Sequence, residues 1–160
     1  MKKTPLKKSN KTLSRSRVLR SFSKSTPARV KREIQAELRI AVSKRDGGCV
    51  LRNHAEAGAC SGPLQAEHLI TRSNSQTFAD LRNIVCLCQR HHIFWKPQNS
   101  RLYWELIRDI IGEERWRWYL LADADRARNQ TRMTLHDWQF QLTMLKRHNA
   151  GAQEQPHGLL

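Results

Sequence analysis

Residues 64–92 read LQAEHLITRSNSQTFADLRNIVCLCQRHH. Two short apolar pieces, LQAEHLI and NIVCLC, lie on either side of a polar loop, and this pattern predicts two short strands joined by that loop. A short helix is expected to begin around Gln89 and to end at Pro97, because proline cannot continue a helix. Loops of this length are often functional. The stretch therefore predicts two strands, one helix and a candidate functional loop.

A helix is predicted before this unit, from near Arg29 to Arg45. Its apolar residues recur at helical spacing, and the turn-forming sequence Asp46-Gly47-Gly48 ends it. The residues expected to face the core are Ile34, Leu38, Ala41 and Val42.

The C-terminal part is predicted to be helical as well. Ser100 is expected to cap a first helix, which Gly112 ends. Residues 113–128 are expected to form a second helix, and a third is expected to begin with Thr134 as its N-cap. We interpret the tryptophans as packing anchors, because an aromatic stripe at helical spacing is more often core than a base-stacking platform. The residues expected to pack are Trp116, Tyr119 and Leu120 in the second helix and Leu135, Trp138, Leu142 and Leu145 in the third.

The positive charge is concentrated at the N-terminus. The 160 residues carry a net charge of +15, and residues 1–32 contain twelve Lys or Arg and no acid, which leaves +3 for the rest. Residues 1–28 are therefore predicted to be a disordered basic arm, and residues 151–160 a flexible tail. A solubilising or targeting tail would have this composition, but we favour an arm that neutralises nucleic-acid phosphates.

Membrane insertion and secretion are not expected. No apolar run approaches the roughly 20 residues that span a bilayer, and no apolar segment of a signal peptide follows the charged N-terminus. We therefore expect a cytoplasmic protein whose four cysteines are free or bind metal rather than pair.

The cysteines suggest a structural zinc site. Cys49, Cys60, Cys88 and His91 supply the thiolates and the imidazole that zinc prefers in a four-ligand shell. The spacing Cys88-x-x-His91 lets one turn present two ligands, whereas Cys49 and Cys60 are far apart for a zinc knuckle, and His54 between them could substitute. Cys86 is expected to be a packing thiol. Alternatively, all four cysteines are buried or free thiols without a metal.

Three further elements resemble the signature of HNH endonucleases, a family with a ββα-metal fold and zinc-binding cysteines beside it. In that family a strand ends in an acidic residue followed by histidine, as Glu67-His68 does here. An asparagine stands five residues before a cysteine, as Asn83 does before Cys88. The histidine that directly follows the last zinc ligand corresponds to His92.

The resemblance covers residues 49–96 and implies an α+β protein with a small ββα-metal core. The core with its leading helix would span residues 29–98, and residues 99–150 would form a helical region packed on it. Two features depart from the family: His91 stands where most zinc-containing members have cysteine, and the first cysteine pair is widely spaced. LIRDIIGEERW is also similar to a segment of the lambdoid-phage NinG (Rap) recombination nucleases, which implies a bacterial or phage-infected host.

Phosphodiester hydrolysis gives each of these residue types a role. A neutral imidazole is a suitable base near pH 7, so His68 is the expected general base and Asn83 is expected to brace its surroundings. Glu67 and His92 are the expected ligands of a catalytic divalent ion. The resemblance implies that this ion is Mg²⁺, Mn²⁺ or another divalent metal, distinct from the structural Zn²⁺.

The sequence thus predicts a metal-dependent endonuclease that acts on duplex DNA or on branched recombination intermediates. Its rivals are a non-catalytic, zinc-ribbon-like nucleic-acid-binding module and a packaging protein that binds through its arm alone. Four cations near the motif are candidate phosphate contacts, although each could simply be a solvated surface charge. They are Arg72, Arg82, Arg90 and Lys96.

Overall fold

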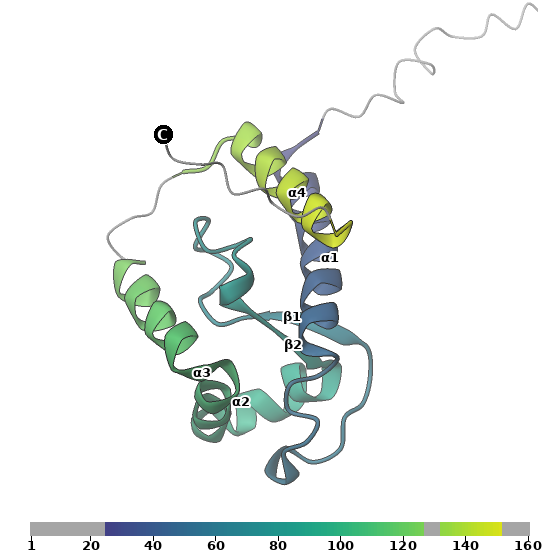
Figure 1. The fold of residues 1–160 in the computed structure, drawn as a ribbon, viewed down its shortest axis with the longest axis vertical. Helices are drawn as coiled ribbons and strands as arrows, with labels where there is room; N and C mark the ends of the chain where they lie inside the picture. The colour runs from purple at the N-terminus through teal and green to yellow at the C-terminus, as the bar shows by residue number, and fades with distance from the viewer. Residues whose placement is uncertain (1–24, 127–131, 152–160) are drawn as a thin grey trace, which may run out of the picture.

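A two-stranded antiparallel sheet lies between helices in the computed structural model, which describes residues 25–126 and 132–151 (Figure 1). β1 (Leu64–His68) pairs with β2 (Ile84–Cys88), with Leu64 opposite Cys88 and His68 opposite Ile84. The predicted strands and the long loop between them are confirmed, and the fold is α+β.

The short helix after β2 is wound in two ways. It begins as a π-helix, Arg90–Trp95, and continues as α2 (Lys96–Gln98). Pro97 does not end it as predicted, because the helix continues for one more residue, to Gln98. A π-turn is rare and frequent at functional sites, and this one carries His91 and His92.

α1 (Pro27–Asp46) and α4 (Leu135–Asn149) pack against each other on one side of the sheet. α1 begins two residues earlier than predicted because the Thr26 hydroxyl accepts from the Arg29 N–H and Pro27 suits the first turn. α4 begins with the predicted Thr134 cap, which forms a reciprocal capping box with Asp137. The residues buried between the two helices include Val30, Ile34 and Leu38 of α1 and Trp138, Leu142 and Leu145 of α4.

α3 (Ser100–Asp125) lies on the other side of the sheet and contains a break at Gly112. The Gly112 backbone has φ 78° and ψ 164°, a conformation that only glycine adopts readily, so the predicted end of a helix is observed there as a kink. Asn99, not Ser100, occupies the N-cap position. Leu120, predicted to pack, is 51% exposed because the second half of α3 turns it toward solvent.

The alternation of side chains along β2 separates two apolar clusters. Ile84 and Cys86 face α1 and α4, whereas Val85 and Leu87 face Tyr103 and other residues of α3. Directly paired residues share a face of the sheet. The register therefore places His68 on the α1 side and Glu67 on the α3 side.

Two arginines fix the turn that leads into β2. The guanidinium groups of Arg45 and Arg115 come from α1 and α3, and each donates to the carbonyl of Ile84 at 2.6 Å. Both also reach the carbonyl of Leu81. Burial lowers the pKa of Arg115 to about 10, which still leaves it charged at neutral pH. Within the described residues, no helix combines the length and apolar character needed to cross a membrane.

Candidate functional site

Four predicted zinc ligands converge at the end of β2. The ligand atoms of Cys49, Cys60, Cys88 and His91 all lie within 4.8 Å of one another. His91 Nδ1 is 3.2 Å, 3.7 Å and 3.3 Å from the three sulfurs in that order. Ligands of a tetrahedral zinc ion stand about 3.5–3.8 Å apart, given the usual zinc–ligand bond lengths. The donor set and its spacing therefore fit a zinc ion.

The second ring nitrogen of His91 supports the same interpretation. Nε2 lies 3.1 Å from the carbonyl oxygen of Ala57, to which it donates, and this leaves the Nδ1 lone pair free for a metal. Arg90 donates to the carbonyls of Ala57 at 2.9 Å and Ala59 at 2.7 Å, so the loop that carries Cys60 is fastened over the site. The loop turns at Gly58, whose φ of +72° favours glycine. A Cβ at this position would also lie only 3.3 Å from the Arg90 guanidinium.

The pKa values of the cysteine thiols are shifted by their surroundings. Burial raises the pKa of Cys49 to about 12. Burial also raises the pKa of Cys88, but the backbone N–H groups of His91 and Ser61 outweigh it and lower that pKa overall. A bound divalent ion would favour the thiolates. Within the described residues His54 is not part of the cluster, and Cys86 is buried in the other apolar cluster with its sulfur 3.7 Å from the Ser43 hydroxyl.

His68 is held by one ring nitrogen and unpartnered at the other. Its Nε2 donates to the carbonyl of Phe78 at 2.9 Å, whereas its Nδ1 is buried and has no hydrogen-bond partner within the described residues. Burial lowers the pKa of His68, and the charge of Arg72 lowers it further, although the Phe78 carbonyl opposes this. His68 is therefore a neutral imidazole near pH 7, with the lone pair of Nδ1 available to accept a proton.

Asn83 braces the loop that orients His68. Its side chain is fully buried; Oδ1 accepts from the Ile70 N–H at 2.6 Å, and Nδ2 donates to the carbonyls of Ile70 and Thr77 at 3.1 Å and 3.0 Å. Thr77 directly precedes Phe78, whose carbonyl holds His68. Asn83 thus ties the segment that leads to Phe78 to the residues after β1 through hydrogen bonds.

Glu67 and His92 face each other across the sheet and the π-helix. His92 Nε2 lies 2.6 Å from one carboxylate oxygen of Glu67, and Lys96 pairs with the other. His92 Nδ1 contacts the side-chain oxygen of Gln65. Burial raises the pKa of Glu67, but the hydrogen bonds from His92 and Lys96 outweigh it and lower that pKa overall. The pair offers one oxygen and one nitrogen ligand, a set that suits several divalent ions.

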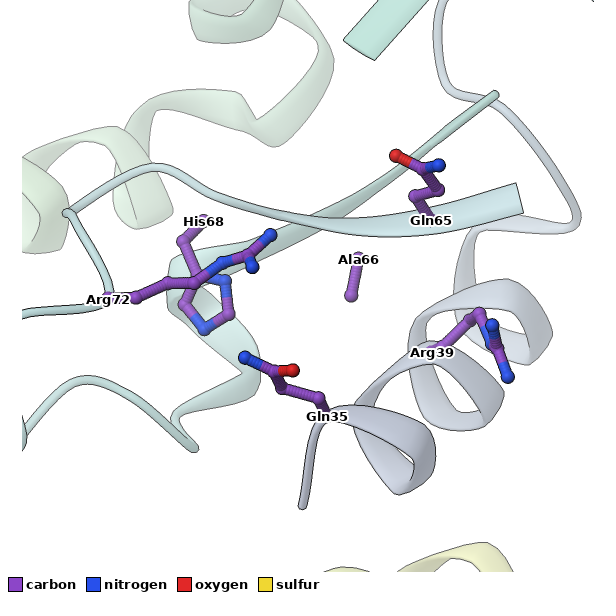
Figure 2. Close-up of a pocket in the computed structure, with 6 residues that line it drawn as sticks. All are labelled: Gln35, Arg39, Gln65, Ala66, His68 and Arg72. Carbon is purple, nitrogen blue, oxygen red and sulfur yellow. The ribbon is translucent and has the colours of Figure 1, made fainter. Parts of the chain in front are cut away.

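A pocket of about 300 Å³ lies beside His68, at the edge of β1 (Figure 2). Gln35 and Arg39 line it from α1, and Arg72 lines it from the loop after β1; of the two α1 side chains, Gln35 is the one drawn toward the His68 ring. Gln65 also lines the pocket and contacts His92, so this single residue links the pocket to the Glu67–His92 pair.

The four predicted phosphate contacts have different surroundings. Arg72 lines the pocket, whereas Arg82 pairs with Asp80 at 2.7 Å and lies over the Trp118 ring. Arg90 holds the zinc-site loop, and Lys96 pairs with Glu67. Of the four, only Arg72 therefore has its guanidinium available without breaking an interaction among the described residues.

Comparison of the chain with protein-family models, curated proteins and solved structures finds no match. The site therefore has to be interpreted from its own residues. Sequence reasoning missed Gln35, Arg39 and Gln65, which line the pocket. The spacing of Gln35 and Arg39, four residues apart on α1 and between its core positions, was the one available signal.

Proposed function

We propose that this protein is a metal-dependent DNA endonuclease of the HNH type. The observation that carries the proposal is the state of His68: its Nε2 is fixed on the Phe78 carbonyl, its buried Nδ1 has no partner among the described residues, and its ring lines an open pocket. A buried, unsatisfied nitrogen costs free energy, so an arrangement that keeps one beside a pocket suits a base that waits for its substrate.

In this mechanism, His68 Nδ1 takes a proton from water while the water oxygen forms a bond to phosphorus. The bond from phosphorus to the leaving sugar oxygen breaks, that oxygen takes a proton from a solvent water molecule, and His68 returns its own proton to the hydroxide left behind. Because the pKa of His68 is lowered, the imidazole is neutral and able to act as a base at physiological pH. Asn83 acts indirectly, by holding the loop on which the Phe78 carbonyl depends.

Glu67 and His92 are the residues that would hold the catalytic divalent ion, Mg²⁺ or Mn²⁺. Their facing atoms are 2.6 Å apart, and a metal ion bound between the two side chains would replace this direct contact. A bound divalent ion supplies positive charge to the phosphate and to the leaving oxygen. In the proposal, a zinc ion on Cys49, Cys60, Cys88 and His91 has a different task, which is to hold the end of β2 and the π-helix together.

DNA is the proposed substrate because of the charge of the chain. The net charge is +15, and the N-terminal segment predicted to be an arm carries most of it. Cations in such numbers favour nucleic-acid phosphates through counterion release. The resemblance of LIRDIIGEERW to NinG nucleases suggests branched recombination intermediates as a substrate, besides ordinary duplex DNA.

One observation favours the second candidate, a non-catalytic zinc module that binds nucleic acid. Both oxygens of Glu67 already have partners, since His92 contacts one and Lys96 the other. This network is complete without an ion, and it could serve only to hold the π-helix on the sheet. The zinc module needs neither His68 nor a second metal.

A cleavage assay separates the two functions. Supercoiled plasmid and a four-way junction would be incubated with the full chain in Mg²⁺, in Mn²⁺ and in chelator. The nuclease predicts cutting that requires the divalent ion, and the preferred substrate indicates whether it acts on duplex or branched DNA. Binding to both substrates without cutting in either metal would favour the zinc module.

A further inference from the structure

Two arginines that line the same pocket as His68 have no partner among the described residues. Arg39 and Arg72 both line the pocket, and neither has a hydrogen bond or ion pair among the described residues. Both are exposed to solvent. Other cations near the site are engaged: Arg90 bonds to backbone carbonyls and Lys96 to Glu67. The two guanidinium groups of the pocket are therefore available to bind an anion.

The acidic side chains of α1 and its pocket-lining side chains lie on different sides of the helix. Glu37 accepts from Asn149 of α4 at 2.7 Å, and Glu33 lies 3.6 Å from Lys146, also of α4. Both glutamates are therefore directed to α4, whereas Gln35 and Arg39 line the pocket. The lining contains no carboxylate, so nothing in it repels a phosphate.

A buried polar atom is aimed into the same pocket. His68 is 7% exposed, and its unpartnered Nδ1 belongs to a ring that lines the cavity. Figure 2 shows this ring together with Arg72, with the Gln35 amide below it. An anion held by the arginines would therefore lie next to a ring nitrogen that has no partner among the described residues.

We infer that Arg39 and Arg72, with the Gln35 amide, bind a phosphate of the DNA strand beside His68, so that α1 forms part of the substrate site. The inference rests on the proposed function. It extends that function because it gives the DNA strand a path along the free edge of β1. Guanidinium groups match the geometry of phosphate and bind it through paired N–H donors. Gln35 adds a neutral donor, and Gln65 connects this phosphate to the side of the sheet that carries Glu67 and His92.

The test uses the full chain with Arg39→Gln and with Arg72→Gln. Arg147→Gln is the matched control, because Arg147 is exposed on α4, has no partner among the described residues and does not line the pocket. Affinity for duplex DNA would be measured in chelator over a range of KCl concentrations. Each pocket variant is expected to reduce the slope of log Kd against log salt, and loss of both arginines to reduce it by about 0.9, the value for one phosphate that is no longer neutralised, whereas the control keeps the wild-type slope. Equal slopes in all four proteins would overturn the inference.

A second readout does not depend on cleavage. The dinucleotide thymidylyl-thymidine, which offers one phosphodiester, would be titrated against protein with isotope-labelled histidine. The His68 ring signals are expected to shift in the wild type and in Arg147→Gln, and not in the double variant of Arg39 and Arg72. If the shift occurs but DNA is never cut, the phosphate site stands and the nuclease proposal fails. If DNA is cut and His68 does not respond, the phosphate site is wrong and the nuclease proposal stands.

Discussion

Asn83 supplies hydrogen bonds that the loop backbone cannot make for itself. The chain between β1 and β2 is irregular, so its buried N–H and C=O groups need side-chain partners. One buried amide satisfies the N–H and the C=O of Ile70 and the C=O of Thr77. A hydrophobic side chain of similar size would leave both groups of Ile70 without a partner among the described residues, whereas the Thr77 carbonyl would keep the Asp80 N–H at 3.3 Å.

Replacement of Asn83 by alanine is therefore expected to lower the free energy of unfolding by about 2–4 kcal/mol, since each buried unsatisfied group costs roughly 1–3 kcal/mol. Urea denaturation of the zinc-loaded protein measures this. Asn53→Ala is the control, because Asn53 is exposed and its loss should change stability by no more than about 0.5 kcal/mol. Equal stability of the two variants would show that the Asn83 bonds do not brace the loop.

The pH response of His68 follows from its burial. Desolvation and the charge of Arg72 lower its pKa below the ordinary 6.5, so the ring is expected to stay neutral until the pH falls below that value. Because the unfolded chain takes up this proton at higher pH, His68 contributes a loss of stability as the pH falls from 6.5 to the folded pKa. The measurement is an NMR titration of the His68 ring, with the signal assigned from His68→Gln. A midpoint above 6.5 would contradict the buried, neutral base.

The residues with chemical roles were largely predictable from the sequence, but their partners were not. Glu67-His68, Asn83 and Cys88-x-x-His91 follow a recognisable order and spacing. By contrast, the acceptor for His68 is a backbone carbonyl, which no residue type reveals. Gln35 and Arg39 reach the site only because α1 packs across the sheet, and that packing is a tertiary property.

At the scale of elements, the four candidate zinc ligands come from three segments of the chain. Cys49 follows α1, Cys60 lies on an exposed loop, and Cys88 ends β2 immediately before the π-helix with His91. The loop between Cys49 and Cys60 holds only a short 3₁₀ turn, Ala55–Ala57. A metal ion would therefore contribute much of the stability of this end of the molecule.

Replacement of Cys88 by serine is expected to abolish zinc binding and to lower the melting temperature by roughly ten degrees or more, because zinc binding and folding are coupled. Cys86→Ala is the control: that thiol is equally buried but packs in the other apolar cluster, so the variant should keep one zinc ion per chain. Zinc content and thermal unfolding would be measured on purified protein. One zinc ion per chain retained by Cys88→Ser would refute this ligand set.

The elements that repeat a clear pattern were predicted well, and the irregular ones were not. The α1 and α4 stripes, the two strands and the break at Gly112 all follow from periodicity and from glycine. The π-winding of Arg90–Trp95 has no signature in the sequence, because it depends on how His91 and His92 are drawn to partners on other segments. Leu120 was misplaced because the helix changes direction at Gly112.

At the scale of the whole molecule, many of the positive charges and the residues of the candidate site lie in different parts of the chain. Residues 1–24, which lie outside the described residues, contain nine of the 29 Lys and Arg, whereas the site residues lie between positions 35 and 96. The predictions of a basic disordered arm and a flexible tail fall mostly on such residues and stay predictions there. The predicted end of the arm at residue 28 is wrong, because Pro27 and the residue after it already belong to α1, and Gly151 of the predicted tail is described as well. The two parts can be separated by truncation.

Deletion of residues 1–24 is expected to weaken DNA binding and to leave the rate at saturating DNA within about threefold of wild type. The slope of log Kd against log salt should fall by about 0.9 for each phosphate that the arm would otherwise neutralise. Both quantities can be measured with one duplex in Mg²⁺ and in chelator. Loss of all DNA binding would instead favour the packaging protein, in which the arm alone binds.

The most direct test of the account is the rate of metal-dependent DNA cleavage by His68→Ala. The comparison includes the wild type and His136→Ala, which removes an exposed histidine from α4. We predict that His68→Ala lowers the rate by about 10²- to 10⁴-fold, the usual loss for a general base, while zinc content and DNA affinity stay as in the wild type and His136→Ala cuts normally. Cleavage by His68→Ala at the wild-type rate would remove His68 from the mechanism and contradict the account at its centre.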